Sequence, residues 1–322
     1  MKNLDRLIDS ILNGDSYAAA RLITMVENDE HTEEIVKRLY PYRKNSYLLG
    51  ITGAPGVGKS TLTDKVIKKF REEDKRIGVI AVDPTSPFTG GALLGDRVRL
   101  QKHATDNKVF IRSMGTRNHF GGLAPNINNV ITILSALGCR YIILETVGVG
   151  QSEIEVVEHA DTVVLVLTPG SGDDIQIMKA GIIEIADIFA LNKADMPGID
   201  KILAELKFFQ TLAESNNHYV PPIVQTIANQ KVGIDELYQA IRNHQNFLSQ
   251  SGKLIQKRKL RIEHEIIGII QEKLLAHTKN RLAADQQLLK IVDSIYQNQE
   301  DPYSIANKVL QNNILTNLGP PK

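Results

Sequence analysis

Cysteine is nearly absent from this sequence, which contains one among its 322 residues, Cys139. A single cysteine cannot form a disulfide framework within the chain, and it cannot supply a multi-cysteine metal cluster. Chains without disulfides are typical of reducing compartments. The cysteine count therefore fits a protein that is kept in a reducing environment.

An excess of one charge and long apolar runs are also lacking. Lys plus Arg is 38 and Asp plus Glu is 37, which gives no electrostatic reason to expect nucleic acid or an anionic membrane as a partner. No segment approaches the roughly 18 consecutive apolar residues that a membrane helix requires. The opening residues, MKNLDRLIDSILNGD, lack the apolar core of a signal peptide. We therefore expect a soluble, cytoplasmic protein without a membrane or nucleic-acid partner.

Short apolar runs alternate with helical patterns from Tyr47 onward. The runs are YLLGIT, IGVIAV, KVFIRS, YIILET, TVVLVLT and DIFALN, with YVPPIVQT as a further candidate. Apolar residues make up 42% of the chain, enough for a substantial core. This alternation predicts an α/β fold with a mainly parallel sheet flanked by helices.

Helical patterns without strands occupy both ends of the chain. Residues 1–46 space their apolar residues at three and four, with a break at 13–15, and long helical patterns follow Gly233. We therefore predict an N-terminal helical extension at 1–46, an α/β domain at 47–245 and a C-terminal helical region at 246–322.

The predicted C-terminal helix carries a basic run and an apolar stripe. The basic run consists of Lys253, Lys257, Arg258, Lys259 and Arg261. Because Glu263, Glu265 and Glu272 follow on the same helix, we interpret this run as a solvated face rather than a phosphate or nucleic-acid site. The stripe consists of Leu260, Ile267, Ile270 and Leu274. It must be buried on the chain's own domain or on a second copy, and we favour a homodimer.

The segment GAPGVGKS has the chemistry of a phosphate-binding loop. It follows a predicted strand, precedes the helical pattern TLTDKVIKKF and matches G-x-x-x-x-G-K-[ST]. Its backbone N–H groups and the helix N-terminus can surround phosphate oxygens. Lys59 would reach the β- and γ-phosphates, and the Ser60 hydroxyl would bind Mg²⁺; the alternative is a plain Gly-rich turn. The predicted nucleotide contacts are Gly53, Ala54, Pro55, Gly56, Val57, Gly58, Lys59, Ser60 and Thr61.

The segment NKAD, from Asn192 to Asp195, follows another predicted strand. The Asp195 carboxylate can accept hydrogen bonds from N1–H and the 2-amino group of guanine, whereas adenine offers no such pair. Lys193 can lie along the base, and Asn192 can brace the loop. By itself the match could be a surface turn, but after a phosphate-binding loop it indicates GTP rather than ATP.

Three further residues are candidates for the base site. The segment QTIA follows the last predicted strand, and we expect Thr226, Ile227 and Ala228 to provide a backbone contact to the guanine oxygen.

Acidic residues stand where strands end. Asp83 directly follows the run IGVIAV, Asp96 follows a polar loop, and Glu145 ends YIILE. Magnesium prefers such oxygen ligands together with several waters, so we expect all three acids near the metal. Turn or helix capping is the alternative for Asp83 and Asp96, and a salt bridge at the rim is the alternative for Glu145.

The residue that positions the attacking water is missing from its usual place. Ras-like switches have a glutamine directly after the glycine that corresponds to Gly148, but here that residue is Val149. Gln151 is the nearest candidate, and it would need the loop to rearrange. The predicted catalytic residues are therefore Lys59, Glu145 and Gln151.

A second glycine-rich acidic loop, TPGSGDDIQIMKAG, begins at Thr168. It contains Asp173, Asp174, Gln176 and Lys179. These residues could respond to nucleotide or to a partner, although helix capping by the two aspartates is an equal alternative. His119 could be read as a catalytic base, but a lone histidine is more often structural.

Six segments together resemble one family. They are GAPGVGKSTL, AVDPTSPFTGGALLGDR, FIRSMGTRNHFGGLA, ETVGVGQSE, PGSGDDIQIMKAG and LNKAD. In order and sequence they are similar to the MeaB/ArgK family of P-loop GTPases, the bacterial counterparts of the human methylmalonic aciduria type A protein. The resemblance covers about Tyr47 to Leu237, with small departures at Asn118 and Asp174.

The resemblance implies a P-loop NTPase fold and a GTP-hydrolysing chaperone of an adenosylcobalamin-dependent acyl-CoA mutase, usually methylmalonyl-CoA mutase. It implies GTP or GDP with Mg²⁺ as ligands, C-terminal helices that form a homodimer, and a loop at 168–179 that senses the mutase. With Val149 in place of glutamine, we expect slow hydrolysis by the chain alone and acceleration by the bound mutase.

Rival functions have less support. A metallochaperone GTPase for nickel or zinc usually carries Cys- or His-rich tracts, whereas the eight histidines here are scattered. A ribosome-associated GTPase would need a basic surface. A small-molecule kinase would be expected to prefer ATP, which Asp195 disfavours.

Overall fold

The computed structural model describes residues 2–84, 101–103, 105–116, 124–146, 159–169, 182–215, 219–284, 287–297 and 299–315. The chain forms two compact units, Met1–Ile262 and Glu263–Lys322. The three-part division predicted from the sequence stays a prediction. No helix among the described residues is both long enough and apolar enough to cross a membrane.

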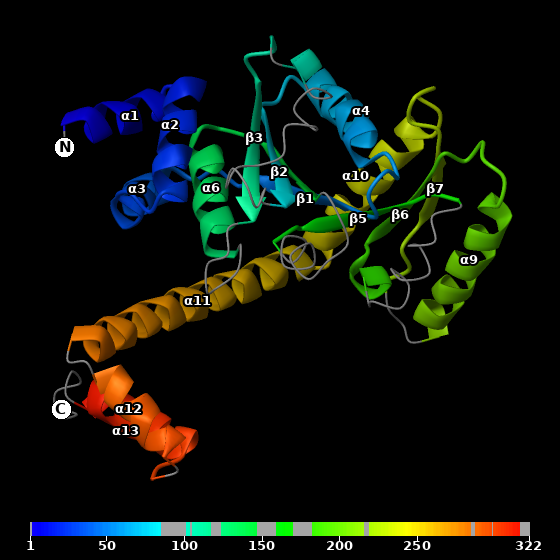
Figure 1. Ribbon diagram of the computed structural model, residues 1–322. Helices are drawn as coiled ribbons and strands as arrows, with labels where there is room; N and C mark the ends of the chain where they lie inside the picture. Colours follow the sequence, from blue (N-terminus) through cyan, green and yellow to red (C-terminus); the bar gives the residue numbers. More distant parts are fainter. Residues whose placement is uncertain are drawn as a thin grey trace. The chain divides into compact units, whose positions relative to one another are not determined.

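The first unit contains the sheet and most of the helices (Figure 1). Its strands are β1 (Tyr47–Thr52), β2 (Ile77–Pro84), β3 (Val109–Thr116), β4 (Tyr141–Thr146), β5 (Thr162–Leu167), β6 (Ile188–Asn192) and β7 (Ile223–Thr226). Its helices are α1 (Lys2–Leu12), α2 (Ser16–Glu27), α3 (Thr32–Leu39), α4 (Lys59–Glu72), α6 (Ala124–Ala136), α9 (Ile199–Ser215) and α10 (Ile234–Gln250). Short 3₁₀ helices are η1 (Tyr40–Tyr42), η2 (Gln101–His103) and η3 (Ile182–Ile185).

Helix α11 (Lys253–Ala284) begins in the first unit and continues into the second. The second unit also contains α12 (Gln287–Tyr296) and α13 (Pro302–Leu315). Asp301 caps α13, because its Oδ1 accepts hydrogen bonds from the backbone N–H groups of Tyr303 and Ser304, each at 2.9 Å.

The seven strands form one parallel sheet in the order β3-β2-β4-β1-β5-β6-β7. The predicted α/β fold is thus confirmed. The last strand is shorter than its apolar run, and it begins at Ile223, after the two prolines, which cannot donate to a strand ladder. Because β1 lies between β4 and β5, the segment after β1 is at the centre of the carboxyl-terminal edge, where such folds bind ligands.

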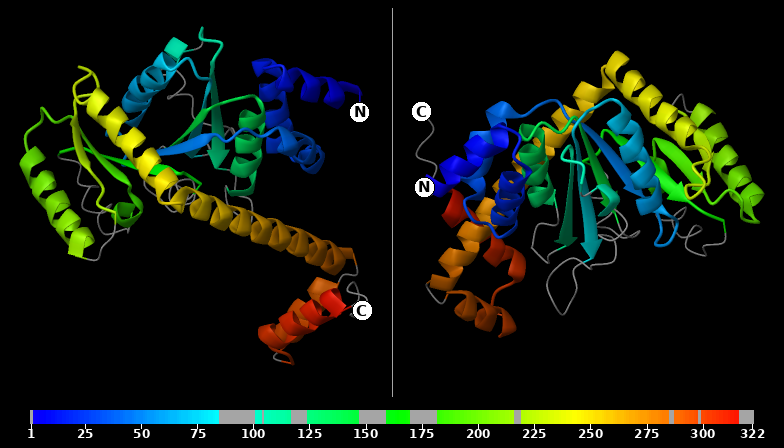
Figure 2. Two further views of the ribbon diagram at one scale, coloured as in Figure 1. Left: turned by 180° about the vertical axis from the view of Figure 1, so that it is seen from behind. Right: turned by 90° about the horizontal axis from the view of Figure 1, so that it is seen from above.

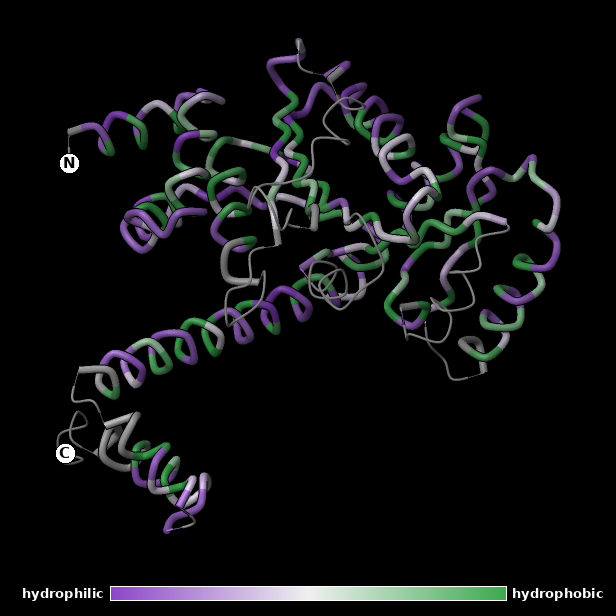
Figure 3. The backbone as a smooth tube through the Cα atoms, viewed as in Figure 1, coloured by the Kyte–Doolittle hydropathy of each residue, from purple (hydrophilic) through white to green (hydrophobic). Residues whose placement is uncertain are grey.

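Helices cover both faces of the sheet because successive strand residues point in opposite directions. Tyr47 and Leu49 of β1 belong to the core that includes α4 and α10. Leu48 belongs to a second core, which α6 and the N-terminal helices α1–α3 complete. Figures 1 and 2 show these two helix groups on opposite sides of the sheet, and Figure 3 shows the apolar residues concentrated along the strands. Helices α1–α3 thus share a hydrophobic core with the sheet.

The basic run at the start of α11 is not the solvated face that the sequence suggested. Arg258 and Arg261 have side chains that are 27% and 15% exposed, and both pair with Asp161, which is fully buried. Burial by itself raises the pKa of Asp161, but the hydrogen bond from Arg258 and the charges of both arginines hold it below its usual value. The interpretation was therefore wrong for these two residues, whereas Lys253 and Lys259 are exposed.

A buried polar chain crosses the amino-terminal ends of the strands. The Tyr47 hydroxyl is hydrogen-bonded to Thr162 Oγ1, which lies 2.6 Å from His244 Nδ1, and His244 Nε2 lies 3.4 Å from Asp187 Oδ1. Burial lowers the pKa of His244 from its usual 6.5, while the charge of Asp187 acts in the opposite direction. A neutral imidazole can accept at Nδ1 from Thr162, whose oxygen then accepts from Tyr47.

We expect His244→Asn to remove part of the acid sensitivity of folding. A histidine whose folded pKa is depressed stabilises the fold fully above pH 6.5, and this contribution is lost as the pH falls from 6.5 toward the folded value. The stability lost by the substitution should therefore shrink on acidification, by at most about 1.4 kcal/mol for each pH unit below 6.5.

Urea unfolding at pH 7.5, 6.5 and 5.5 measures this difference. His264→Asn, on the exposed part of α11, is the matched control and should leave the pH profile unchanged. A stability difference between wild type and His244→Asn that stays constant with pH would contradict the expectation.

Candidate nucleotide-binding site

The phosphate-binding loop joins β1 to α4 and lies against β5. Gly53 has φ +145°, and a Cβ on it would lie 2.2 Å from the carbonyl oxygen of Val166. Only glycine permits this close approach. The loop enters α4 through Gly58, and no side chain caps that helix start. The helix N-terminus therefore presents its partial positive charge toward the loop.

Lys59 is held inside this loop. Its side chain is only 6% exposed, and Nζ donates to the carbonyl oxygens of Gly53 at 2.6 Å and Ala54 at 2.8 Å. An ammonium group in this position adds a full positive charge to a loop whose backbone can already accommodate an anion. Pro55 and Gly56, at the tip of the loop, are exposed.

A hydroxyl and a carboxylate meet beside the loop. Ser60 Oγ donates to Glu145 Oε1 at 2.6 Å, and both residues are buried. The register of β1 with β4 pairs Ile51 with Glu145, which brings the ends of these strands together. Thr146 Oγ1 donates to Thr52 Oγ1 at 2.9 Å and ties the same two ends. Paired hard oxygen atoms at this position fit the ligand preference of Mg²⁺.

The other predicted metal ligands are less fully described. In the register of β2 with β4, Ala81 pairs with Glu145, so the backbone of Asp83 stands two residues farther along β2. The Asp83 side chain lies outside the described residues. So do Asp96 and Gln151, together with Val149, His119 and residues 170–179. Of the predicted switch loop, Thr168 and Pro169 are described, and both are buried at the end of β5.

Asn192, at the end of β6, connects the two predicted nucleotide loops. Its side-chain Nδ2 donates to the carbonyl oxygen of Val57 at 2.7 Å. Its Oδ1 accepts from Thr226 Oγ1 at 3.1 Å and from the Ala228 backbone N–H at 3.2 Å. Lys193, at φ +56°, donates from Nζ to the Gly56 carbonyl oxygen at 2.9 Å. The NKAD segment therefore holds the phosphate-binding loop at two points.

The remaining base-site candidates lie close to Asn192. Asp195 is exposed, so its carboxylate is accessible to a ligand. The Thr226 side chain is fully buried, and the Ile227 N–H donates to the Val232 carbonyl oxygen at 3.0 Å. Because the backbone donors of Ile227 and Ala228 are bonded within the protein, the expected guanine contact by these residues stays a prediction.

One buried pair next to the site has no signal in the sequence motifs. Asp64 lies one helical turn after Ser60, and its Oδ1 lies 2.8 Å from His103 Nε2, with both side chains nearly buried. Burial acts to raise the pKa of Asp64, but the hydrogen bonds from Lys65 and His103 and the charges of Lys65 and Lys68 together lower it. The pair fixes η2 against the helix that carries Lys59 and Ser60.

One family model and several known proteins are similar to this chain over most of its length. Residues 19–283 match the family model described as methylmalonyl-CoA mutase-associated GTPase MeaB. A protein from Pyrococcus abyssi that is named as a GTPase is 50% identical over 316 residues, which are 96% of each chain. The mitochondrial methylmalonic aciduria type A homolog of Mus musculus is 32% identical over 304 residues, covering 88% of this chain and 73% of that protein.

A solved structure shares the fold. It is described as an LAO/AO transport system kinase, and it has a TM-score of 0.71 and 24% identity over 97% of each chain. At this identity the likeness shows the fold alone.

We expect Gly58→Ala to weaken nucleotide binding by displacing Asn192. A Cβ at this position would lie 2.4 Å from Asn192 Nδ2, and the residue has φ +99°. Loss of the contact with Val57 should reduce affinity for a fluorescent GDP analogue by at least about tenfold, the equivalent of one charge-free hydrogen bond or more.

Gly56→Ala is the matched control, because Gly56 also has positive φ, +79°, but a Cβ there meets nothing within 4 Å. Both variants carry similar backbone strain, so the difference between them isolates the displacement of Asn192. Equal losses of affinity in the two variants would contradict this explanation.

Proposed function

The chain belongs to the MeaB family of methylmalonyl-CoA mutase-associated GTPases, and from this membership we propose that this GTP hydrolase is a cytoplasmic chaperone of an adenosylcobalamin-dependent acyl-CoA mutase. Methylmalonyl-CoA mutase is the expected client. GTP binding and hydrolysis would gate the loading of the cofactor and protect or reactivate the mutase. The family description and the name of the mouse relative support the client.

The nucleotide part of the proposal rests on the hydrogen bond from Asn192 in the NKAD segment to Val57 in the phosphate-binding loop. Asn192 fixes the segment that would read guanine to the loop that would hold the phosphates. A nucleotide that spans both loops would thus meet a preorganised site and lose little free energy to ordering it. Asp195 would accept from guanine N1–H and the 2-amino group, and the α4 N-terminus with Lys59 would face the phosphates.

Ser60 and Glu145 are the described residues that would hold Mg²⁺, with Asp83 and Asp96 as the further predicted ligands. When bound, the ion would supply positive charge to the β- and γ-phosphate oxygens. Ser60 and Glu145 already share a hydrogen bond at 2.6 Å. Their oxygen atoms therefore need little movement to face a common ligand.

Hydrolysis requires a positioned water molecule in addition to bound nucleotide. Val149 cannot orient water, because its side chain has no hydrogen-bonding group. In this proposal the bound mutase orders the segment that contains Gln151 and so supplies the missing positioning. Correct positioning and an added charge can change such rates by roughly 10³–10⁵.

We expect slow GTP hydrolysis by the purified protein and a rise of at least about tenfold when the mutase from the same organism is added, because positioning contributes more than that in related reactions. Phosphate release over time measures both rates. Lys59→Ala should be inactive with and without the mutase, which excludes a contaminating hydrolase. Rapid hydrolysis by the protein alone, without a gain from the mutase, would refute the chaperone proposal.

A second copy of the chain is the partner that we infer for α11. The side chains of Leu260, Ile267, Ile270 and Leu274 are between 46% and 55% exposed. Exposed apolar side chains in a row on one long helix are unfavourable in water, and a symmetric pairing of two copies would bury them. The resemblance to a family with C-terminal dimerisation supports the same partner.

Ile267→Glu combined with Ile270→Glu should weaken the homodimer by at least about 100-fold, because two unpaired carboxylates would be buried in the interface. Light scattering over a range of protein concentrations measures the mass. Gln271→Glu, at an exposed neighbouring position, is the control and should remain dimeric. A wild-type protein that is monomeric at all concentrations would overturn the inference.

A further inference from the structure

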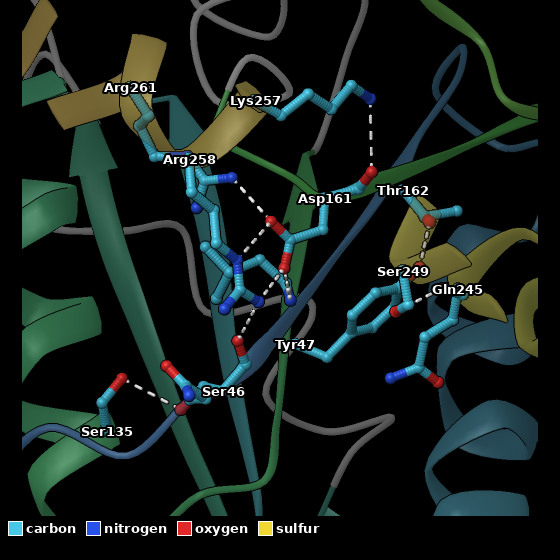
Figure 4. Close-up of polar contacts among 12 residues, drawn as sticks. Ser46, Tyr47, Ser135, Asp161, Thr162, Gln245, Ser249, Lys257, Arg258 and Arg261 are labelled. Atoms are coloured by element: carbon cyan, nitrogen blue, oxygen red, sulfur yellow. Dashed lines mark hydrogen bonds and ion pairs between the residues drawn. The ribbon is translucent and has the colours of Figure 1, made fainter. Parts of the chain in front are cut away.

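Three basic residues in the first turns of α11 form ion pairs and hydrogen bonds with two acidic residues at the amino-terminal ends of strands. We call the set Asp161, Asp187, Lys257, Arg258 and Arg261 the α11 clamp. Figure 4 shows Asp161 together with the three basic residues. Arg258 Nη2 lies 2.7 Å from Asp161 Oδ2, and Arg261 Nη2 lies 2.7 Å from Asp161 Oδ1. Lys257 Nζ donates to the Asp161 carbonyl oxygen at 3.2 Å and lies 3.4 Å from Asp187 Oδ2.

The α11 clamp reaches three neighbouring strands. Asp161 directly precedes β5, and its Oδ2 also accepts from the Leu48 N–H of β1 at 3.0 Å. Arg258 donates a further hydrogen bond to the carbonyl oxygen of Ser46, just before β1, at 2.8 Å. Asp187 directly precedes β6, and its Oδ2 accepts from the Val163 N–H of β5 at 2.9 Å. One stretch of helix thus ties the starts of β1, β5 and β6.

The same three strands carry the nucleotide site at their other ends. The phosphate-binding loop follows β1, Thr168 follows β5, and Asn192 ends β6. Asn192 must reach across the end of β5 to contact Val57 at 2.7 Å. That contact depends on the spacing of β1 and β6, which are both paired to β5. The α11 clamp fixes this spacing at the amino-terminal ends of the strands. The contact of Asn192 with Val57 depends on the same spacing at their carboxyl-terminal ends.

We propose that docking of the first turns of α11 through the α11 clamp is coupled to nucleotide binding, with Arg258 and Arg261 as positioning residues for the guanine-nucleotide site. In the docked state, the clamp holds β1, β5 and β6 in the spacing that Asn192 requires. In the released state, residues 253–262 leave Asp161 and the site loses that support. The proposal rests on the nucleotide site described above.

The docked and released states differ in the burial of the Asp161 carboxylate. Asp161 is fully buried, so removal of either arginine leaves a carboxylate charge that is incompletely compensated in the interior. A released helix lets water reach Asp161, which favours the released state in such variants. Arg258 bonds Asp161 and Ser46 at once through its planar guanidinium, and a lysine point charge cannot reproduce both bonds.

Thermodynamic linkage gives the coupling a quantitative signature. If nucleotide binding favours the docked state by some factor, docking must raise nucleotide affinity by the same factor. GDP should therefore slow amide hydrogen exchange in residues 253–262, although these residues contact the amino-terminal ends of the strands and the phosphate-binding loop follows a carboxyl-terminal end. A purely structural role would lower the unfolding temperature and leave this exchange insensitive to GDP.

The full-length chain carrying Arg258→Gln and Arg261→Gln tests the proposal. Titration calorimetry with GDP and Mg²⁺ should give a dissociation constant at least about fivefold above wild type, which is a typical size for coupling between two sites. Hydrogen exchange at 253–262 should be faster than in wild type, and its response to GDP should be lost. Lys259→Gln removes a charge from the same turn of helix at an exposed position, and it should stay within about twofold of wild type.

Arg258→Lys is the milder second variant, and it keeps the proposal testable if the double variant does not fold. It should shift affinity and exchange in the same direction by a smaller factor. GDP affinity in folded variants equal to that of wild type, or exchange at 253–262 that does not respond to GDP in wild type, would overturn the coupling. A wild-type chain that binds no GDP would instead overturn the nucleotide site and, with it, this inference.

Discussion

The amide side chain of Asn192 makes the hydrogen bonds on which the proposed nucleotide site depends. Its Nδ2 donates to Val57 in the phosphate-binding loop, and its Oδ1 accepts from Thr226, the last residue of β7, and from Ala228, which follows that strand. Three loops that are distant in the sequence thereby share one nearly buried group. A buried amide that lost any of these partners would leave polar atoms unsatisfied at a cost of about 1–3 kcal/mol each. The arrangement therefore favours one geometry of the loops over neighbouring ones before any ligand is present.

At the amino-terminal ends of the same strands, charged side chains instead of an amide connect neighbouring elements. Asp161 carries a full charge in a buried position, which is unfavourable unless partners compensate it. It has two arginines and a backbone N–H. Such a cluster contributes little net stability compared with apolar packing, but it tolerates few alternative arrangements. Because β1, β5 and β6 have contacts at both ends, the parallel sheet would be the rigid element between α11 and the nucleotide loops in the proposed coupling.

Local sequence was sufficient to predict the strands of the sheet and the position of the phosphate-binding loop after β1. Each apolar run became a strand because parallel strands covered on both faces need continuous apolar residues. Gly53 and Gly58 of the phosphate-binding loop lie where a Cβ would meet a neighbouring atom at 2.2 and 2.4 Å. The contacts of Asp161 could not be predicted, because 97 residues separate it from Arg258 in the chain. The glutamates that follow Arg261 made a solvated helix face the simpler interpretation. The Asp64–His103 pair was missed for the same reason, since 39 residues separate its two members in the chain.

Binding and hydrolysis place different demands on this chain. In the proposed function, the contacts of Lys59, Ser60 and Asn192 would serve to hold a nucleotide, and they are formed by buried groups within one unit. In the proposed function, positioning of water would fall to the segment after Gly148, where Val149 has no hydrogen-bonding side chain. A site that binds its ligand without help but needs a partner for the reaction would stay in its GTP-bound form until that partner binds. The partner would then set the time of hydrolysis, which is the property that a chaperone requires if it is to act only when its client is in place.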